Sequence, residues 1–168
     1  MVQQAAQVRL RVLLADRDNS WQEAARLLLE PHGVQTLTVR TGRDALEIIE
    51  RREVHVAVLD QEMPQLNGLQ IVRMAQARVE ARGETRGETH GEAGGPAGTR
   101  AGVVPAILLT QSLTNHLLQQ ALGNRVFSVL SKPVQLEVLL DTLARVVRRH
   151  YEDRWPVEFQ PTSNNPAT

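Results

Sequence analysis

Short apolar runs alternate with amphipathic stretches along most of this chain. The clearest run covers residues 54–60, in which five of the seven residues are aliphatic. That length and the three valines indicate a buried strand rather than part of a helix. Four similar runs, at residues 8–15, 34–39, 103–110 and 125–130, are also predicted to be strands.

Each predicted strand is followed by a segment in which apolar residues recur at helical spacing. These helices are expected to end near Glu30, Arg52, Arg82, Gly123 and His150. Asp18 or Asn19, Thr41 with Asp44, and Ser112 stand where N-caps are expected for three of them. Five strand–helix units in succession predict an α/β protein with a doubly wound parallel sheet. For five strands we expect the flavodoxin-like order 2-1-3-4-5.

A segment of low complexity interrupts this pattern between the third helix and the fourth strand. Residues 83–102 hold seven of the chain's 11 glycines, and residues 82–93 contain three copies of a four-residue unit of the type Arg-Gly-Glu-Thr. Because such a segment has almost nothing to bury, we expect a flexible insertion in a single domain covering residues 1–150. Residues 151–168 contain three prolines and a polar end, and are expected to form a flexible tail.

Composition removes several functional classes. The 19 basic and 19 acidic residues cancel, so charge gives no reason to expect binding to nucleic acid or to an anionic membrane. There is no cysteine, which excludes disulfides and thiolate chemistry. No apolar run approaches the ~20 residues of a membrane span, and the first residues lack the pattern of a signal peptide. We therefore expect a cytoplasmic protein.

Polar residues stand at the ends of four predicted strands. Asp16 ends the first strand and Asp60 the third, and these strands flank the topological switch point where open α/β sheets bind ligands. Thr110 and Lys132 end the fourth and fifth strands beside it. On the strand pattern alone, Asp60 is as easily a helix cap or turn residue as a reactive group. Convergence of the four favours a reactive site.

The residues at these strand ends resemble those of the receiver domain of bacterial two-component response regulators. The resemblance covers Val8 to about His150. Each matching piece is weak alone, but the four in this order at strand ends are specific: Leu14-Ala15-Asp16, Leu59-Asp60 with Met63-Pro64 and Asn67-Gly68, Leu109-Thr110, and Ser131-Lys132-Pro133.

The resemblance implies a role for each strand-end residue. Asp60 would be the phosphoacceptor, Thr110 the switch hydroxyl, and Lys132 the contact to the phosphoryl group through a cis Lys132–Pro133 bond. Asp16, Asp60 and the backbone carbonyl of Glu62 would hold Mg²⁺, which suits the hard oxygen ligands that this ion prefers. The chemistry agrees, because a carboxylate can act as nucleophile toward phosphorus. Lys132 is also the only lysine among 19 basic residues.

Arg17 is the first departure from the family pattern. The family usually has a second acid at this position, so one expected Mg²⁺ ligand is lost and Mg²⁺ binding should be weakened. The guanidinium could point to solvent, or it could lie across the cleft and pair with Asp60. Asp18 is the candidate for the missing carboxylate, although it stands one residue too far along.

Two further departures concern the switch elements. The aromatic residue expected three positions before the lysine is replaced by Val129. Phe127 lies two residues earlier, and a shift of two along a strand would keep it on the same face. Gln111 follows Thr110, where a small residue is usual, and could crowd the site.

The leading hypothesis is a stand-alone receiver that accepts a phosphoryl group from a histidine kinase or phosphotransfer protein. Output would then be contact with a downstream protein, in the family usually through the fourth helix, fifth strand and fifth helix, and a homodimer is possible. The alternative is a phosphorylation-independent pseudo-receiver that acts as a binding or dimerisation module. A hydrolase with Glu62 as base is disfavoured because no further acid cluster or substrate cap is apparent. Enzymatic activity would at most be self-phosphorylation and dephosphorylation of Asp60.

Overall fold

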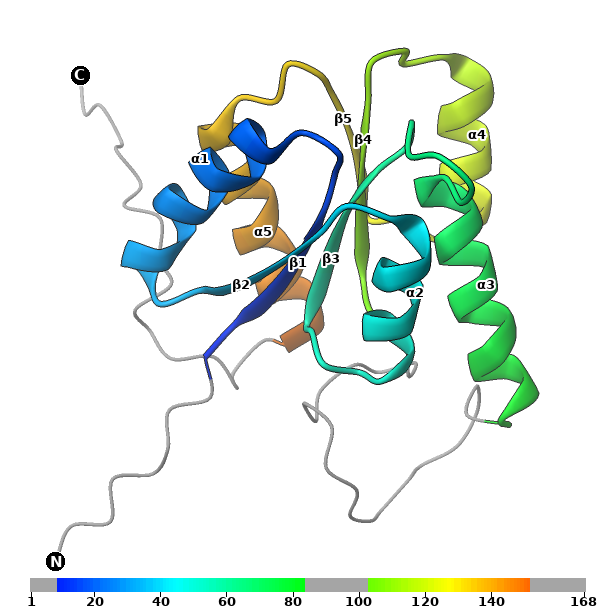
Figure 1. The fold of residues 1–168 in the computed structure, drawn as a ribbon. Coiled ribbons are helices and arrows are strands. Elements are labelled where there is room, and N and C mark those ends of the chain that lie inside the picture. The colour runs from blue at the N-terminus through cyan, green and yellow to red at the C-terminus, as the bar shows by residue number, and fades with distance from the viewer. Residues whose placement is uncertain (1–8, 84–102, 152–168) are drawn as a thin grey trace, which may run out of the picture.

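The computed structural model describes residues 9–83 and 103–151, which form a parallel sheet with flanking helices (Figure 1). The strand order is β2-β1-β3-β4-β5, and every neighbouring pair is parallel. The flavodoxin-like order predicted from the sequence is therefore confirmed. The elements in chain order are β1 (Arg11–Ala15), α1 (Asn19–Leu29), a 3₁₀ helix η1 (Glu30–His32), β2 (Gln35–Val39), α2 (Gly42–Glu50), β3 (Val56–Asp60), α3 (Gly68–Ala81), β4 (Ala106–Thr110), α4 (Asn115–Gly123), β5 (Ser128–Ser131) and α5 (Leu136–Tyr151).

The helices cover both faces of the sheet. Helices α1 and α5 lie on one face, and α2, α3 and α4 lie on the other (Figure 1). All five residues of β3 are buried, because helices cover this central strand on both sides. Each face has its own aliphatic core, one including Leu13, Leu59 and Leu108 and the other including Leu14, Val58 and Leu109. The alternation of neighbouring residues between the two cores follows from the period of two along a strand.

Polar side chains fix the starts of the helices. Asp18 caps α1, Thr41 caps α2 and Asn67 forms a capping box with Gln70 at the start of α3. The expected cap of α4 was wrong, because Thr114 rather than Ser112 accepts the hydrogen bond from the first turn. Ser112 instead belongs to the turn after β4, where its N–H donates to Thr110 Oγ1.

Helix α4 buries less of its apolar surface than its sequence suggests. Leu117 and Ala121 are the buried positions, one turn apart, and both face the sheet. Leu118 is 41% exposed and Leu122 is 80% exposed, although both belong to the apolar pattern of this helix. Leu113 precedes the helix and is also exposed. A nine-residue helix at the side of the sheet thus leaves an uncovered apolar stripe.

The expected insertion and tail fall mostly outside the described residues. Helix α3 ends at Ala81, and the chain is described again from Val103. Tyr151, expected to begin the tail, is instead the last residue of α5 and is buried. Its hydroxyl donates a 2.6 Å hydrogen bond to the backbone carbonyl of His55, and its ring packs edge-on against the His55 imidazole. The contact joins the end of α5 to the segment that leads into β3.

Two glycines allow backbones to approach closely near the carboxyl end of β3. A Cβ at Gly68, the first residue of α3, would lie 2.8 Å from Leu108 Cδ2 and 3.1 Å from the carbonyl oxygen of Asp60. A Cβ at Gly42 would lie 2.4 Å from the carbonyl oxygen of Leu66. Helices α2 and α3 therefore begin directly against the loop and strand that carry Asp60.

Candidate functional site

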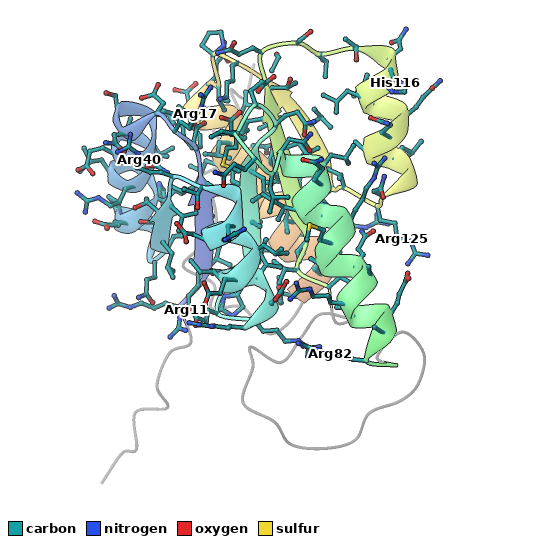
Figure 2. All side chains as sticks on the ribbon, turned by 45° about the vertical axis from the view of Figure 1, so that its right-hand side comes forward. Arg11, Arg17, Arg40, Arg82, His116 and Arg125 are labelled. Carbon is teal, nitrogen blue, oxygen red and sulfur yellow. The ribbon has the colours of Figure 1, made fainter. Side chains whose placement is uncertain are left out.

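A cleft of about 710 Å³ lies at the carboxyl ends of the strands. Figure 2 shows Arg17 at this end of the molecule and Arg11 at the opposite end. Because strands β1 and β3 are neighbours, the loops that follow them separate here, as expected at a topological switch point. The residues that line the cleft are Asp16, Arg17, Asp18, Trp21, Asp60, Glu62, Gln111, Lys132, Pro133 and Val134.

Lys132 joins the two strand-end carboxylates. Its Nζ lies 2.9 Å from Asp60 Oδ1 and 3.1 Å from Asp16 Oδ2. Both carboxylates are almost fully buried, and Lys132 is largely covered. The peptide bond between Lys132 and Pro133 is cis, as the family resemblance implied. Three residues that are distant in the sequence are thus brought together as predicted.

The surroundings of Lys132 keep its amine charged. Burial lowers the pKa of this amine. The hydrogen bonds to Asp60 and Asp16, together with the charges of both carboxylates, raise the pKa by more than burial lowers it. The net effect is a pKa above the ordinary value for lysine. The ammonium form of Lys132 is therefore stabilised between Asp16 and Asp60.

Backbone donors fix the orientation of each carboxylate. Asp60 Oδ1 also accepts from the N–H of Glu62 at 3.0 Å, and Asp16 Oδ1 accepts from the N–H of Asp18 at 2.9 Å. No described residue donates to Asp60 Oδ2. One oxygen of Asp60 is thus held by two donors, and the other is left for chemistry in the cleft.

Thr110 lies at the end of β4 and bonds to Glu62 rather than to Asp60. Its hydroxyl donates a 2.6 Å hydrogen bond to Glu62 Oε1, which also accepts from the N–H of Gln111 at 2.9 Å. Glu62 Oε2 is buried and has no partner among the described residues. The structure therefore makes the Glu62 side chain a hydrogen-bond partner of Thr110, whereas the sequence suggested its backbone carbonyl as a metal ligand and its carboxylate only as the base of a disfavoured hydrolase.

Arg17 and Asp18 occupy the rim of the cleft. Arg17 is exposed and forms no ion pair with Asp60 or with any other described residue. Of the two orientations left open by the sequence, the structure has the one toward solvent. Asp18 Oδ1 accepts from the N–H groups of Ser20 and Trp21, so this carboxylate is used as the cap of α1.

The structure corrects the suggested substitute for the aromatic switch residue. Val129 packs with the core beneath α3 and α4, whereas Phe127 packs on the opposite face of the sheet, with its ring 5.9 Å from that of His150. Phe127 precedes the first residue of β5, so the alternation of a strand does not extend to it. Gln111 is exposed, and its backbone rather than its side chain bonds within the site.

Gln22 is a supporting residue that sequence patterns did not reveal. It is buried on α1, and its amide lies within hydrogen-bond distance of three backbone carbonyls, at 3.0 Å from Leu14 and Asp16 and 2.7 Å from Val39. These contacts hold the ends of β1 and β2 together beneath Asp16. The signal available in the sequence was a glutamine at helical spacing from Ala25 and Leu29, the apolar residues that α1 buries.

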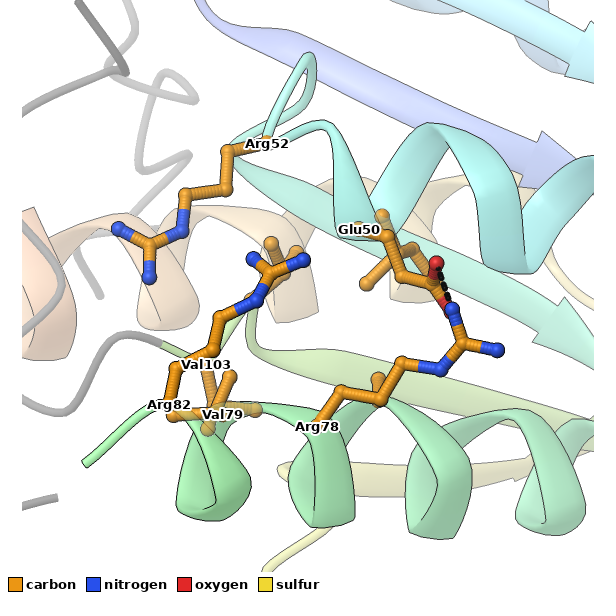
Figure 3. A pocket seen from close by; sticks show the side chains of 9 residues that line it. Glu50, Arg52, Arg78, Val79, Arg82 and Val103 are labelled. Carbon is orange, nitrogen blue, oxygen red and sulfur yellow. Dashed lines mark hydrogen bonds and ion pairs between the residues drawn. The ribbon is translucent and has the colours of Figure 1, made fainter. Parts of the chain in front are cut away.

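Other parts of the described chain offer no comparable site. A cavity of about 20 Å³, roughly the space of one water, lies between α2 and α3 and is lined by Arg52, Arg82 and an Arg78–Glu50 ion pair (Figure 3). In the described residues, no three His, Asp or Glu side chains are grouped as a metal site. None of the helices described is both long and apolar enough to span a membrane.

Residues 12–81 match the protein family described as the response regulator receiver domain. Among curated proteins, the chain is 32% identical over 68 residues to response regulator MprA of Mycolicibacterium vanbaalenii. It is 39% identical over 67 residues to a protein-glutamate methylesterase/protein-glutamine glutaminase of Nitrobacter winogradskyi. These matches cover 40% and 36% of this chain, but only 29% and 15% of the relatives' own length.

Solved structures show that the likeness of fold extends across the described body. A CheY-like receiver domain protein from Methanospirillum hungatei has a TM-score of 0.66 at 18% identity, covering 84% of this chain and 96% of its own. Chemotaxis protein CheY4 of Vibrio cholerae has a TM-score of 0.64 at 22% identity, covering 83% and 99%. At such identities the likeness concerns the fold.

Proposed function

We propose that this chain is a response regulator receiver and that Asp60 accepts a phosphoryl group from a histidine kinase or phosphotransfer protein; the match of residues 12–81 to the receiver family and the CheY-like fold support this proposal. The observation that carries the proposal is the cluster at the switch point. Asp60 is buried there, one of its oxygens is held by Lys132 at 2.9 Å and by the N–H of Glu62, and the other has no donor from a described residue.

The arrangement suits an in-line transfer. A lone pair of Asp60 Oδ2 forms the new O–P bond while the P–N bond of a donor phosphohistidine breaks, and the imidazole takes the electron pair of that bond. Positive charge close to the phosphoryl oxygens stabilises the transition state. Lys132 Nζ supplies such a charge next to Asp60, and its raised pKa keeps it protonated.

Mg²⁺ is compatible with the donors at this site. Asp16 and Asp60 supply two carboxylates whose oxygens meet at one point, where Lys132 Nζ lies in the structure, and one or two carboxylates with waters and phosphate oxygens are a usual Mg²⁺ environment. Together with the Glu62 carbonyl they would hold the ion, which would neutralise charge on the phosphoryl oxygens. The ammonium group of Lys132 and the nearby guanidinium of Arg17 would weaken that binding.

For output, we propose contact with a downstream protein or a second copy of the chain through the face of α4, β5 and α5. Leu118 and Leu122 on α4 and Val138 on α5 are exposed apolar residues on these elements. Burial of such side chains in a contact stabilises a complex by about 1.5–3 kcal/mol for each fully covered residue.

The experiment is phosphorylation of the purified protein with a small-molecule phosphodonor and Mg²⁺, followed by intact-mass measurement. We expect one added phosphoryl group, lost at alkaline pH as an acyl phosphate should be, and no addition to Asp60→Asn. Addition that persists in Asp60→Asn would place the acceptor elsewhere and overturn the assignment.

One observation favours a pseudo-receiver as the second candidate. Lys132 already pairs with both buried carboxylates, and Arg17 replaces an acid, so the cluster is stable without a metal or phosphoryl group. If no phosphoryl group is added with any donor or partner kinase while the protein still binds a partner through the α4–β5–α5 face, the pseudo-receiver becomes the better account.

A further inference from the structure

The Thr110 hydroxyl donates to the carboxylate of Glu62, and it would have to leave this acceptor in order to donate to a phosphoryl group on Asp60. Thr110 is 1% exposed, and its hydroxyl has a single proton. That proton lies toward Glu62 Oε1, at an oxygen–oxygen distance of 2.6 Å, with the carbonyl of Ser112 at 3.2 Å as the poorer acceptor. Hydrogen bonds from a hydroxyl to an ionised carboxylate are about twice as strong as neutral ones.

A second donor strengthens the same contact. The backbone N–H of Gln111 donates to the same oxygen of Glu62, and the N–H of Ser112 donates to Thr110 Oγ1. The turn after β4 is therefore held by a side chain that comes from the loop after β3, 48 residues away in the sequence. Since the backbone N–H of Glu62 donates to Asp60 Oδ1, this holding residue is itself bonded to the proposed phosphoacceptor.

A phosphoryl group on Asp60 would be a rival acceptor. Its oxygens are anionic, as the Glu62 carboxylate is, and one hydroxyl proton cannot serve both. Glu62 Oε2 is buried without a partner among the described residues, so the donors that hold this carboxylate in place are the Thr110 hydroxyl and the Gln111 N–H, both at Oε1.

We propose that Glu62 is a positioning residue that competes with the phosphoryl group for the hydroxyl of Thr110. The strength of the Glu62–Thr110 hydrogen bond then sets how strongly the phosphoryl group must bind Thr110 before the turn at residues 110–112 rearranges. The inference rests on the proposed function, and it adds to that function a threshold set by this chain's own side chain. Loss of the carboxylate should release Thr110 and make the phosphorylated arrangement easier to reach.

The inference is tested first without any ligand, by NMR measurement of the Thr110 side-chain rotamer. We expect one rotamer in the wild type and averaging between rotamers in Glu62→Ala. Glu62→Gln keeps the shape and one acceptor oxygen, so it serves as the variant that should fold without difficulty and show partial release. A Thr110 rotamer that is unchanged in both variants would overturn the inference, whatever Asp60 does.

The second measurement is the affinity for beryllofluoride with Mg²⁺, a mimic of the phosphoryl group, followed by Trp21 fluorescence in a Trp155→Phe background. We expect Glu62→Gln to raise this affinity about three- to tenfold in the presence of the Thr110 hydroxyl. In a Thr110→Val background, the same substitution should raise the affinity much less. An equal gain with and without the Thr110 hydroxyl would reduce Glu62 to a simple repulsive charge and overturn the competition. If no variant binds beryllofluoride but Thr110 is still released, the proposed function fails and the holding role of Glu62 stands.

Discussion

Replacement of Lys132 by methionine would test the charge cluster most directly. Methionine has a similar length and no charge, so Lys132→Met removes the ammonium group and leaves most of the packing. Asp16 and Asp60 would then be two buried carboxylates facing each other with no cation between them. Removal of one partner of a buried ion pair is strongly destabilising because it leaves an uncompensated charge.

The size of the effect follows from the two distances. With an effective dielectric constant near 20, an amine attracts a carboxylate by about 6 kcal/mol at 2.9 Å and about 5 kcal/mol at 3.1 Å. Desolvation of the three groups offsets most of this attraction, and measured losses for broken buried pairs are about 3–5 kcal/mol. Because Lys132 is 19% exposed, we expect the lower value, about 3 kcal/mol of the free energy of unfolding, or roughly 10 °C in melting temperature.

The assay is urea unfolding of the wild type, Lys132→Met and Arg17→Met with and without Mg²⁺. Arg17→Met is the matched control, because it removes from the same cleft a cation that has no ion pair with a described residue, and we expect a change below about 0.5 kcal/mol. Mg²⁺ should stabilise Lys132→Met more than the wild type, since the ion meets two uncompensated carboxylates.

The stability difference between wild type and Lys132→Met should depend on pH in the alkaline range. Because the pKa of Lys132 is raised on folding, the contribution of the bridge is fully present below the unfolded value of about 10.4 and is lost as pH rises through the higher folded value. The difference between wild type and Lys132→Met should therefore be constant near neutrality and shrink above about pH 10.5. A loss below about 1 kcal/mol at neutral pH would refute the bridge as a structural element.

Three other predictions concern single side chains. Arg17→Asp should tighten Mg²⁺ binding several-fold in a titration and speed phosphorylation of Asp60, while the metal-free protein becomes less stable; equal affinity would mean that the exposed Arg17 does not influence the ion. Tyr151→Phe removes the hydrogen bond to the His55 carbonyl and should lower the free energy of unfolding by about 1 kcal/mol in urea titrations; no loss would show that the bond contributes nothing. Burial and the charge of Arg11 lower the pKa of His55 to about 4, so stability should be full above about pH 6.5 and fall toward pH 4, a slope that His55→Gln should abolish.

The periodicity of the sequence was enough to predict the fold. Five strand–helix units and the acids at the ends of the first and third strands led to the strand order and to one shared cleft, and both follow from local pattern and general topology. The buried face of helix α4 was harder to predict. Leu117, Leu118, Ala121 and Leu122 are all apolar, and periodicity alone does not say which of them face the sheet. Helix α4 buries Leu117 and Ala121 and leaves the other two in solvent.

The site was predicted where residues act through backbone position and missed where they act through side-chain direction. Asp16, Asp60 and Lys132 meet because strand ends meet. Glu62 reaches Thr110 across 48 residues through a long side chain whose rotamer no sequence pattern specifies. The placement of Phe127 was wrong for a related reason, because the alternation of a strand applies only from its first residue onward.

Gly68 limits how this protein can be redesigned. It has no functional group, yet a methyl group at this position would lie 2.8 Å from Leu108 Cδ2 and 3.1 Å from the carbonyl oxygen of Asp60. A saturation library of the domain should therefore contain two kinds of intolerant position. Substitutions of the first kind remove a reactive group, whereas substitutions at position 68 keep every reactive group and displace the strand that carries Asp60. Grafting the acidic cleft onto another α/β scaffold requires this glycine as much as it requires the lysine.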